Sequence, residues 1–351
     1  MTSITKPPVK HPGARTNELG LTLRDYEGSM STLCAGCGHD SVTAALVQAA
    51  WELALPPHMA AKMSGIGCSS KTTAYFMKQS HGFNSVHGRM PSVTSGASAA
   101  NRTLVSIGVS GDGDSLSIGL GQLSHAIRRN VNMLYVLENN GVYGLTKGQF
   151  SASADVGSKS KKGEANVQSP IDPVLLALTL GATFVARSFS GDKKQLVPIL
   201  KAGIRHKGFA LVDVISPCVT FNDHEGSTKS YAYTRQHEVE AVTTDFVPLR
   251  REITMPETDT AMAVVQMHDG SSVRLRSTSG GYDPTDRASA YAHVRACQAR
   301  GEIATGLLFV DQGGHDMCDG LALPDQALVD VPYDRLCPGG KAMERLMERY
   351  R

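Results

Sequence analysis

The chain has 351 residues, of which 41% are hydrophobic and 19% are charged, a composition typical of an ordinary soluble globular enzyme. This length supports one large hydrophobic core or two modest ones. The 35 basic and 33 acidic residues nearly cancel, giving a formal net charge of +2. Such a balance argues against a protein that binds nucleic acid or an anionic membrane surface through general charge.

The N-terminal stretch 1–13 is polar and lacks the apolar run of a signal peptide. The longest apolar stretches, such as 174–180, are too short to cross a bilayer. Seven cysteines are scattered along the chain, and this odd number favours metal ligands or free thiols in a reducing compartment over a disulfide framework. We therefore expect a cytoplasmic protein with no membrane segment.

The predicted elements follow one another in a regular order, and the sequence has no internal repeat. Residues 1–29 are expected to form an N-terminal arm. A helix with apolar positions at helical spacing follows over 41–55, and then a short strand over 59–68 that ends in a glycine-rich turn. Further on, strands and helices alternate: strand 104–109, helix 115–129, strand 131–137, helix 172–180, strand 183–187, helix 192–206 and strand 209–215.

This alternation predicts a doubly wound α/β domain with a mostly parallel sheet over 30–225. Ligands of such folds bind beyond the carboxyl ends of the strands. Cys68, Asp112, Asn140 and Cys218 each lie at or just past a predicted strand end. We therefore expect these four residues on one edge of the sheet.

The C-terminal part, 226–351, shows a weaker pattern and is predicted to be an α+β extension. A hairpin is expected over 261–276, a helix up to Cys297 and a strand over 307–310. We expect this extension to pack on the core and on a partner subunit.

Two short motifs indicate a site for a diphosphate and a divalent cation. Gly111-Asp112-Gly113 is followed, after 25 residues, by Asn139-Asn140. Glycines allow the backbone to approach phosphate oxygens, and a helix that begins after Asp114 adds the positive end of its dipole. Asp112 and Asn140 supply the oxygen ligands that Mg²⁺ prefers. Each motif alone could be a simple turn, but their positions after two adjacent strands favour a functional site.

The cysteines fall into two groups. Two residues separate Cys34 from Cys37, 30 residues separate Cys37 from Cys68, and another 149 separate Cys68 from Cys218. Cysteine thiolates bind either zinc or an iron–sulfur cluster, and Cys34 and Cys37 could also form a redox pair. The spacing alone does not distinguish these three interpretations. The other three lack partner spacing and are expected to be buried or idle thiols. They are Cys297, Cys318 and Cys337.

The motifs resemble those of known enzymes. Gly-Asp-Gly paired with Asn-Asn is similar to the signature of thiamine-diphosphate enzymes. The chain further contains, in order, Cys-x-x-Cys-Gly-His, Gly-Ile-Gly-Cys-Ser, His-Gly-Arg, Asn-Asn-x-x-Tyr-Gly-Leu-Thr-x-Gly-Gln and Ser-Pro-Cys. This order resembles the β subunits of 2-oxoacid:ferredoxin oxidoreductases over nearly the whole chain, most closely those that act on 2-oxoglutarate. One departure is Ala35, where many relatives carry proline.

The resemblance implies a set of ligands. Asp112, Asn140 and the carbonyl of Val142 would bind Mg²⁺. Four cysteines would hold one [4Fe–4S] cluster: Cys34, Cys37, Cys68 and Cys218. Further contacts to thiamine diphosphate are expected from Ile66, Gly67, Cys68, Ser69, His87, Gly113, Asp114, Gly144 and Leu145.

Three further side chains beside the motifs have less specific roles. His39 is expected to pack or to form hydrogen bonds, because a lone histidine is more often structural than catalytic. Lys71 and Lys147 are candidates for binding the substrate carboxylate, and an ordinary solvated lysine is the alternative for each.

The resemblance also implies partners. An α subunit would supply the pyrimidine-binding domain and the carboxylate that activates the thiamine, so the chain would act in a complex, expected to be a dimer of αβ heterodimers. Ferredoxin, CoA and a 2-oxoacid would be its other partners. Pyruvate or a broad range of 2-oxoacids remains an alternative to 2-oxoglutarate. Two other classes of protein remain as alternatives. A non-redox decarboxylase or carboligase would explain the thiamine motifs but not the cysteines, and an electron-transfer module without thiamine would explain the cysteines but not the thiamine motifs.

Overall fold

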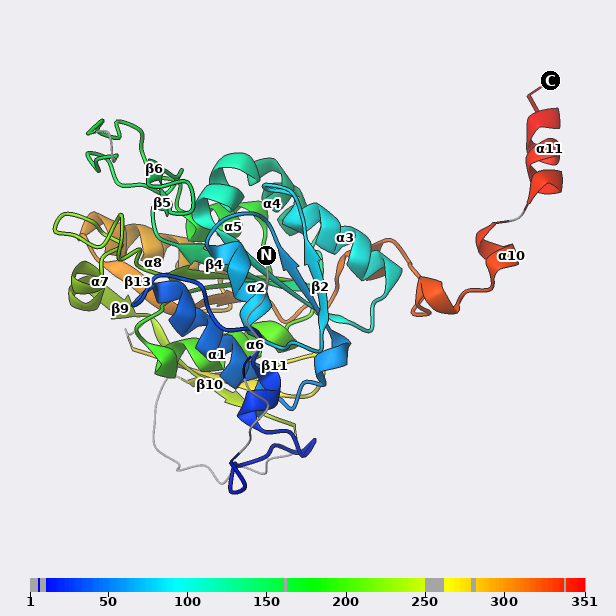
Figure 1. The fold of residues 1–351 in the computed structure, drawn as a ribbon, viewed down its shortest axis with the longest axis horizontal. Coiled ribbons are helices and arrows are strands. Elements are labelled where there is room, and N and C mark those ends of the chain that lie inside the picture. The colour runs from blue at the N-terminus through cyan, green and yellow to red at the C-terminus, as the bar shows by residue number, and fades with distance from the viewer. Residues whose placement is uncertain are drawn as a thin grey trace.

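The computed structural model describes residue 6 and residues 11–160, 163–249, 262–278, 282–337 and 339–350. Its centre is an eight-stranded sheet with the order β2-β1-β3-β4-β8-β7-β13-β9 (Figure 1). The first six strands in this order run parallel, as the sequence predicts. They are β2 (His81–Asn84), β1 (Ala60–Ser64), β3 (Val105–Gly111), β4 (Met133–Asn139), β8 (Phe209–Ile215) and β7 (Phe184–Phe189).

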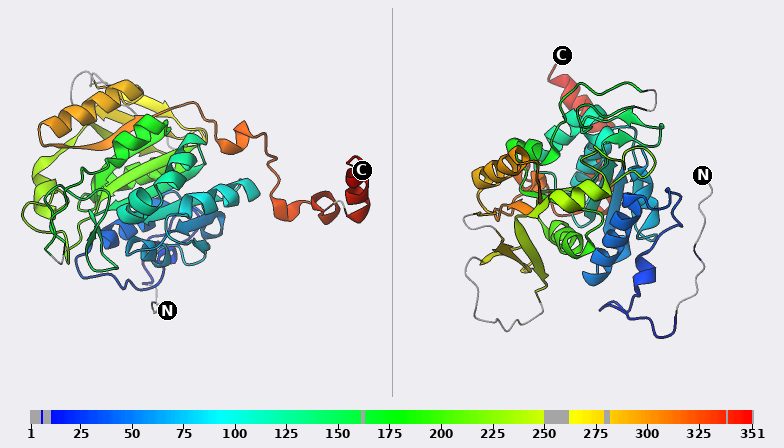
Figure 2. Two further views of the ribbon diagram at one scale, coloured as in Figure 1. Left: turned by 90° about the horizontal axis from the view of Figure 1, so that it is seen from above. Right: turned by 90° about the vertical axis from the view of Figure 1, so that its left-hand side faces the viewer.

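Helices cover both faces of this sheet (Figure 2). On one face, α1 (Gly38–Glu52) packs against α6 (Lys193–Arg205). On the other, neighbouring helices contact one another in series: α3 (Met90–Ala100), α4 (Leu120–Arg128), α5 (Pro173–Leu180) and α8 (Arg287–Ala299). Strands β4, β7 and β8 are buried along their whole length, which explains their continuous apolar sequences. The predicted doubly wound fold is thereby confirmed.

The starts of three helices follow directly from the sequence. Asp172, Asp192 and Asp286 are the N-cap residues of α5, α6 and α8, and each side chain accepts hydrogen bonds from two backbone N–H groups. Such caps satisfy donors that the first turn of a helix leaves unpaired.

Two predicted helices differ from the observed ones in a way that matters for the site. Helix α1 begins at Gly38 instead of Ser41, so Cys37 is its N-cap residue. The helix predicted over 115–129 is divided into a π-helical segment, η4 (Gly113–Ile118), and α4. Strand β2 and helix α3 were not predicted. β2 is exposed along its length and its sequence lacks an apolar pattern, and most of the buried positions of α3 are threonine or serine.

The C-terminal extension contributes two strands to the main sheet. β13 (Ile303–Val310) pairs antiparallel with β7, and β9 (Glu238–Glu240) pairs with β13. A separate sheet contains β10 (Val242–Val247), β12 (Ser272–Ser277) and β11 (Met262–Gln266). The pairing of β11 with β12 confirms the predicted hairpin over residues 262–276, whereas Ala261 lies outside the described residues.

Several short elements complete the fold. They are η1 (Leu23–Tyr26), η2 (Pro57–Met59), η3 (Ser69–Lys71), α2 (Thr72–Tyr75), β5 (Val142–Tyr143), β6 (Gln149–Phe150), α7 (Tyr231–His237), α9 (Met317–Gly320), η5 (Leu328–Asp330), α10 (Tyr333–Leu336) and α11 (Gly340–Glu348). Among the helices formed by the described residues, none is long and apolar enough to cross a membrane.

The two ends of the chain behave differently. The described part of the N-terminal arm is bound to the core: Tyr26 is fully buried, and the N–H groups of Gly28 and Ser29 donate to the carbonyls of Tyr75 and Ala74. The C-terminal segment instead leads away from the body of the molecule and ends in α11, which has no buried residue (Figures 1 and 2).

Candidate cofactor and cluster site

One pocket lies at the carboxyl ends of β1, β3 and β4. All nine residues that the resemblance assigned to thiamine contacts line it, together with Asp112, Asn140 and Val142. Gly111 of the Gly-Asp-Gly motif also lines it, and three further lining residues were not assigned to the cofactor from the sequence: His39, Tyr143 and Thr146. The parallel strands explain the convergence, because their carboxyl ends meet at one edge of the sheet.

Asp112 is a buried carboxylate at the end of β3, with a relative exposure of 1%. Its Oδ2 accepts hydrogen bonds from the Gly141 N–H at 2.9 Å, from the Ser153 hydroxyl at 2.5 Å and from the Ser151 hydroxyl. Burial raises the pKa of this carboxyl, although the serine hydrogen bonds lower it in part. Because these bonds converge on Oδ2, Oδ1 is the oxygen available to a divalent cation, which would compensate the buried charge.

The loop after β4 holds the other proposed magnesium ligands. Gly141 has a φ of +76°, and a Cβ there would lie 2.6 Å from the amide nitrogen of Asn222. That amide donates to the Asn140 carbonyl at 2.7 Å. The Asn140 Oδ1 accepts from the Val142 N–H at 3.0 Å, which fixes the side chain within the turn. The side chain of Asn140 and the carbonyl of Val142 thus belong to one tight turn beside Asp112.

Glycines make room at the end of the pocket suited to a diphosphate. A Cβ on Gly113 would lie 2.5 Å from the ring of Tyr143, whose hydroxyl donates to the Gly113 carbonyl at 2.9 Å. Asp112 precedes η4 without capping it through its side chain, so the first N–H groups of this segment are left for a ligand. These features fit the phosphate groups of thiamine diphosphate.

Asp114 lines the same pocket but is engaged by the protein. Its Oδ1 accepts from the Gly88 N–H at 2.8 Å and from the Ile66 N–H at 3.3 Å, and its Oδ2 accepts from the Ser110 hydroxyl at 2.7 Å. A Cβ on Gly65 would lie 1.8 Å from Oδ2. Asp114 therefore ties together the loops that carry Ile66 and His87.

The four cysteines of the motif come together beside this pocket. A Cβ built on Gly144 would lie 3.4 Å from the sulfur of Cys68 and 3.7 Å from that of Cys218. The thiol of Cys34 accepts a hydrogen bond from the Thr220 hydroxyl at 3.5 Å. It lies close enough to Cys68 and Cys218 for its charge to raise the pKa of both thiols. The charge of Cys218 likewise raises the pKa of Cys37.

Among the described residues, no three side chains of His, Cys, Asp or Glu lie close enough to hold one ion. A [4Fe–4S] cluster binds each cysteine at a different iron and spaces its ligands more widely. Burial raises the pKa of Cys37 to about 12 and also raises those of Cys68 and Cys218, so the thiolate forms of these residues need a compensating positive charge.

His39 and Glu138 form a buried polar contact at the boundary between the pocket and the cysteines. The His39 Nδ1 lies 2.7 Å from the Ser216 hydroxyl and 3.4 Å from the Glu138 carboxyl. Burial lowers the pKa of His39 to about 4 and raises that of Glu138 well above its usual value. Burial therefore disfavours the charged form of both partners in this contact.

The remaining predicted residues lie outside the pocket lining. Lys71 ends η3, three residues after Cys68, and its charge lowers the pKa of that thiol against the larger effect of burial. Lys147 is exposed on the loop after β5, with a φ of +75°. Cys297 and Cys318 are buried and Cys337 is exposed, in agreement with the expectation of buried or idle thiols.

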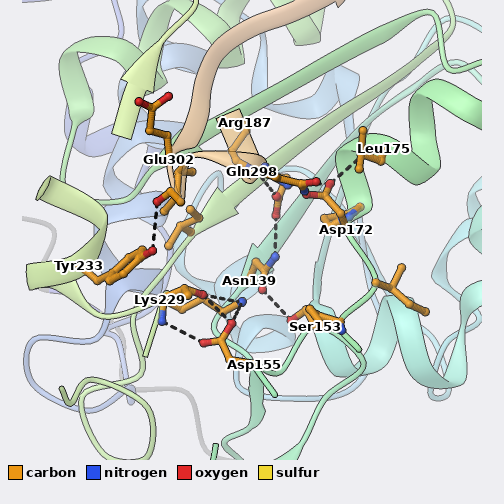
Figure 3. Close-up of a pocket in the computed structure, with 18 of the residues that line it drawn as sticks. Asn139, Ser153, Asp155, Asp172, Leu175, Arg187, Lys229, Tyr233, Gln298 and Glu302 are labelled. Carbon is orange, nitrogen blue, oxygen red and sulfur yellow. Dashed lines mark hydrogen bonds and ion pairs between the residues drawn. The ribbon is translucent and has the colours of Figure 1, made fainter. Parts of the chain in front are cut away.

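A second cavity, of about 480 Å³, is lined by residues at the end of β4, in β7 and β8, and on α8 (Figure 3). Arg187 donates to Asp213 at 2.7 Å and to Asp172 at 2.9 Å, and Lys229 pairs with Asp155 at 3.2 Å. Sequence reasoning missed this cavity, because its charged residues come from separate elements without a shared motif.

Comparisons with known proteins agree with this geometry. Residues 65–214 match the family model described as "Thiamine pyrophosphate enzyme, C-terminal TPP binding domain". The 2-oxoacid:ferredoxin oxidoreductase subunit beta of Saccharolobus solfataricus is 42% identical over 208 residues, 59% of this chain and 68% of that protein. The 2-oxoglutarate oxidoreductase subunit KorB of Mycobacterium tuberculosis is 38% identical over 222 residues, 63% of this chain and 59% of that protein.

A solved structure extends the likeness. The 2-oxoglutarate:ferredoxin oxidoreductase of Magnetococcus marinus, with 2-oxoglutarate, coenzyme A and succinyl-CoA bound, matches with a TM-score of 0.70 and 30% identity. The match covers 86% of this chain and 89% of that one. The fold and the pocket define a thiamine-diphosphate-binding domain. More particularly, the chain belongs to the family of 2-oxoacid:ferredoxin oxidoreductase beta subunits.

The geometry of Asp112 leads to a first prediction. In the Asp112→Asn variant, the amide oxygen can still accept the hydrogen bonds that Oδ2 accepts, but the charge facing the cation is lost. We expect thiamine diphosphate and Mg²⁺ to be lost on gel filtration while the iron content stays at the parent level, as measured by thiochrome fluorescence and metal analysis. Asp245→Ala, on the exposed side of β10, is the control. Retention of thiamine diphosphate by Asp112→Asn at the parent level would contradict the assignment.

The cysteine geometry leads to a second prediction. Cys218→Ala removes one of the two sulfurs that flank Gly144 and should abolish the visible absorbance of the anaerobically purified protein and its reduced-state EPR signal. Cys337→Ala, which changes an exposed thiol remote from the pocket, should leave both signals unchanged. Equal iron contents in the two variants would remove Cys218 from the ligand set.

Proposed function

We propose that this chain is the β subunit of a 2-oxoglutarate:ferredoxin oxidoreductase. The complete enzyme would interconvert 2-oxoglutarate and CoA with succinyl-CoA and CO₂, and would exchange the pair of electrons with ferredoxin. The observation that carries the proposal is the position of Gly144. This residue lines the thiamine pocket, and its α carbon faces the sulfurs of both Cys68 and Cys218. A 2-oxoacid oxidation that passes electrons from thiamine to a cluster needs this proximity.

The proposed cofactors are thiamine diphosphate, Mg²⁺ and one [4Fe–4S] cluster. Asp112, Asn140 and the Val142 carbonyl would hold Mg²⁺. Cys34, Cys37, Cys68 and Cys218 would hold the cluster. Bound thiamine diphosphate supplies the electron sink for cleavage of the 2-oxoacid, and the protein supplies its orientation and the exit for electrons.

The pocket also supports the need for an α subunit. Its lining contains two carboxylates, those of Asp112 and Asp114, and both accept several hydrogen bonds from the protein. Neither is free to activate the aminopyrimidine ring of thiamine. We infer that a pyrimidine-binding domain on a partner subunit supplies this carboxylate, with residues 30–225 as the thiamine and cluster domain, and that the assembly is a cytoplasmic dimer of αβ heterodimers.

The choice of 2-oxoglutarate is supported by the relatives. The Magnetococcus marinus enzyme binds 2-oxoglutarate, coenzyme A and succinyl-CoA, and the Mycobacterium tuberculosis relative is named a 2-oxoglutarate oxidoreductase subunit. The matched segments span 68% and 59% of the Saccharolobus and Mycobacterium proteins.

Reconstitution tests this function. Co-expressed with its α subunit, the chain should catalyse CoA-dependent reduction of a viologen dye with 2-oxoglutarate, and the isolated chain should not, because it lacks the pyrimidine-activating carboxylate. Anaerobic spectrophotometry with 2-oxoglutarate and pyruvate measures both. Turnover by the isolated chain would contradict the need for a partner. A complex that prefers pyruvate would contradict the assigned substrate.

A substrate prediction concerns Lys71. The distal carboxylate of 2-oxoglutarate needs a cation when it enters a closed pocket, and Lys71 lies on the turn after Cys68. Loss of one charge-assisted contact should lower kcat/KM for 2-oxoglutarate about ten- to a hundredfold in Lys71→Ala and affect pyruvate much less. Lys147→Ala is the matched comparison. Equal losses for both acids in Lys71→Ala would mean that the lysine supports the fold or the cofactor and does not select the substrate.

A further inference from the structure

A buried group of four polar side chains lies between the cysteines and the magnesium loop. His39, Thr72, Glu138 and Ser216 are at most 1% exposed, and we call them the polar hub. Each belongs to a different segment of the site. His39 follows Cys37 by two residues, Thr72 follows Cys68 by four, Ser216 precedes Cys218 by two, and Glu138 precedes Asn140 by two.

The side chains of the hub bond to one another across these segments. The Thr72 hydroxyl donates to both carboxyl oxygens of Glu138, at 3.2 Å each. Glu138 contacts the His39 Nδ1 at 3.4 Å, and the same nitrogen lies 2.7 Å from the Ser216 hydroxyl. Side chains thus link all three cysteine-bearing segments to the strand that leads into the magnesium loop.

The backbone near the hub is shaped to permit these contacts. Gly38 approaches the Ser216 segment so closely that a Cβ would lie 2.6 Å from the Ser216 hydroxyl and 2.8 Å from that of Ser190. Its N–H donates to the Pro217 carbonyl at 3.2 Å. The start of α1 is therefore held directly against the segment that leads to Cys218.

The hub also reaches the thiamine pocket. The ring of His39 contributes to the pocket lining, and its Nε2 lies 3.5 Å from the amide nitrogen of Asn140. Buried polar side chains that satisfy one another have few alternative arrangements, because an unpaired partner loses its hydrogen bond without gaining water. Such a group is suited to holding the segments that carry its side chains at fixed positions relative to one another.

We propose that the polar hub is a positioning device, in which His39, Thr72, Glu138 and Ser216 set the distance and orientation of the cluster ligands relative to the thiamine pocket. The inference rests on the proposed cluster and adds residues that neither bind iron nor contact phosphate. The hub joins segments from four separate parts of the chain. It thereby fixes the distance between the thiamine pocket and the iron ligands.

Thr72→Val tests the proposal with little change in shape, since valine replaces the hydroxyl with a methyl group. Thr305→Val is the matched control. Thr305 is 1% exposed on β13, and its hydroxyl accepts a hydrogen bond from Gln195 at 3.2 Å, but it lies at the far end of the sheet. Thr72→Ser is the conservative variant that keeps the donor. All variants are studied in the assembled complex.

The measurements are iron release to a chelator, the EPR spectrum of the reduced protein and the midpoint potential of the cluster. Loss of one buried hydrogen bond should make Thr72→Val release iron about five- to tenfold faster than Thr305→Val, with an altered EPR spectrum and potential. Thr72→Ser should restore all three towards the parent values. His39→Ala should behave as Thr72→Val does.

Two results would overturn the inference, and they are distinguishable. If Thr72→Val and His39→Ala match Thr305→Val in iron release, EPR spectrum and potential, the hub has no positioning role, although the cluster stands. If the parent complex contains no iron, the cluster assignment itself is wrong, and the positioning role is lost with it. Faster iron release with an unchanged spectrum and potential would reduce the hub to general stability and would also refute positioning.

Discussion

The carboxylate of Asp112 is buried at the end of β3, where an uncompensated charge is costly. Hydrogen bonds from the loop after β4 and from Ser151 and Ser153 converge on one of its oxygens. The carboxylate therefore brings together three loops and leaves an oxygen for a cation. Ser153 also donates to Asn139 at 2.9 Å, and Asn139 donates to Asp213 at 3.0 Å, so the same bonds reach the Arg187 ion pairs of the second cavity.

Glycines set how closely the loops can approach. Gly65, Gly111, Gly113 and Gly141 each face an atom that a Cβ would meet within 3 Å. A side chain at any of these positions would separate the loops and open the pocket. Gly144 differs, because a Cβ there would meet the two sulfurs at ordinary contact distance. The glycine therefore leaves space between the thiamine pocket and the cysteines.

The residues proposed to hold the cluster and the thiamine cofactor share one edge of the sheet, although they are far apart in the sequence. Parallel strands make this possible, because every βα unit returns its next loop to the same edge. Among its described residues, the C-terminal extension contributes none to the pocket lining. It adds strands to the other end of the sheet and then leads away from the body (Figure 1).

The sequence by itself determined the doubly wound fold, the succession of its central strands along the chain and the motif residues of the pocket. Each apolar run that ends in Gly-Asp-Gly or Asn-Asn contains a strand and its functional residues within a few adjacent positions. Sequence patterns report such adjacent residues, so both could be predicted. The resemblance of the cysteine motifs added the ligand set, which spacing alone left open. The start of α1 at Gly38, ahead of the predicted Ser41, and the exposed strand β2 escaped prediction, because neither has a local apolar signal.

Only the tertiary structure decided which distant side chains meet. Ser153 bonds to Asp112 from 41 positions away, and His39 meets Ser216 across 177 positions. Neither serine belongs to the aspartate, asparagine or cysteine ligand set, and serine is common in ordinary loops, so their roles could not be predicted. These contacts arise from the packing of whole elements on the sheet. They depend on distances in space that no local pattern of residues encodes.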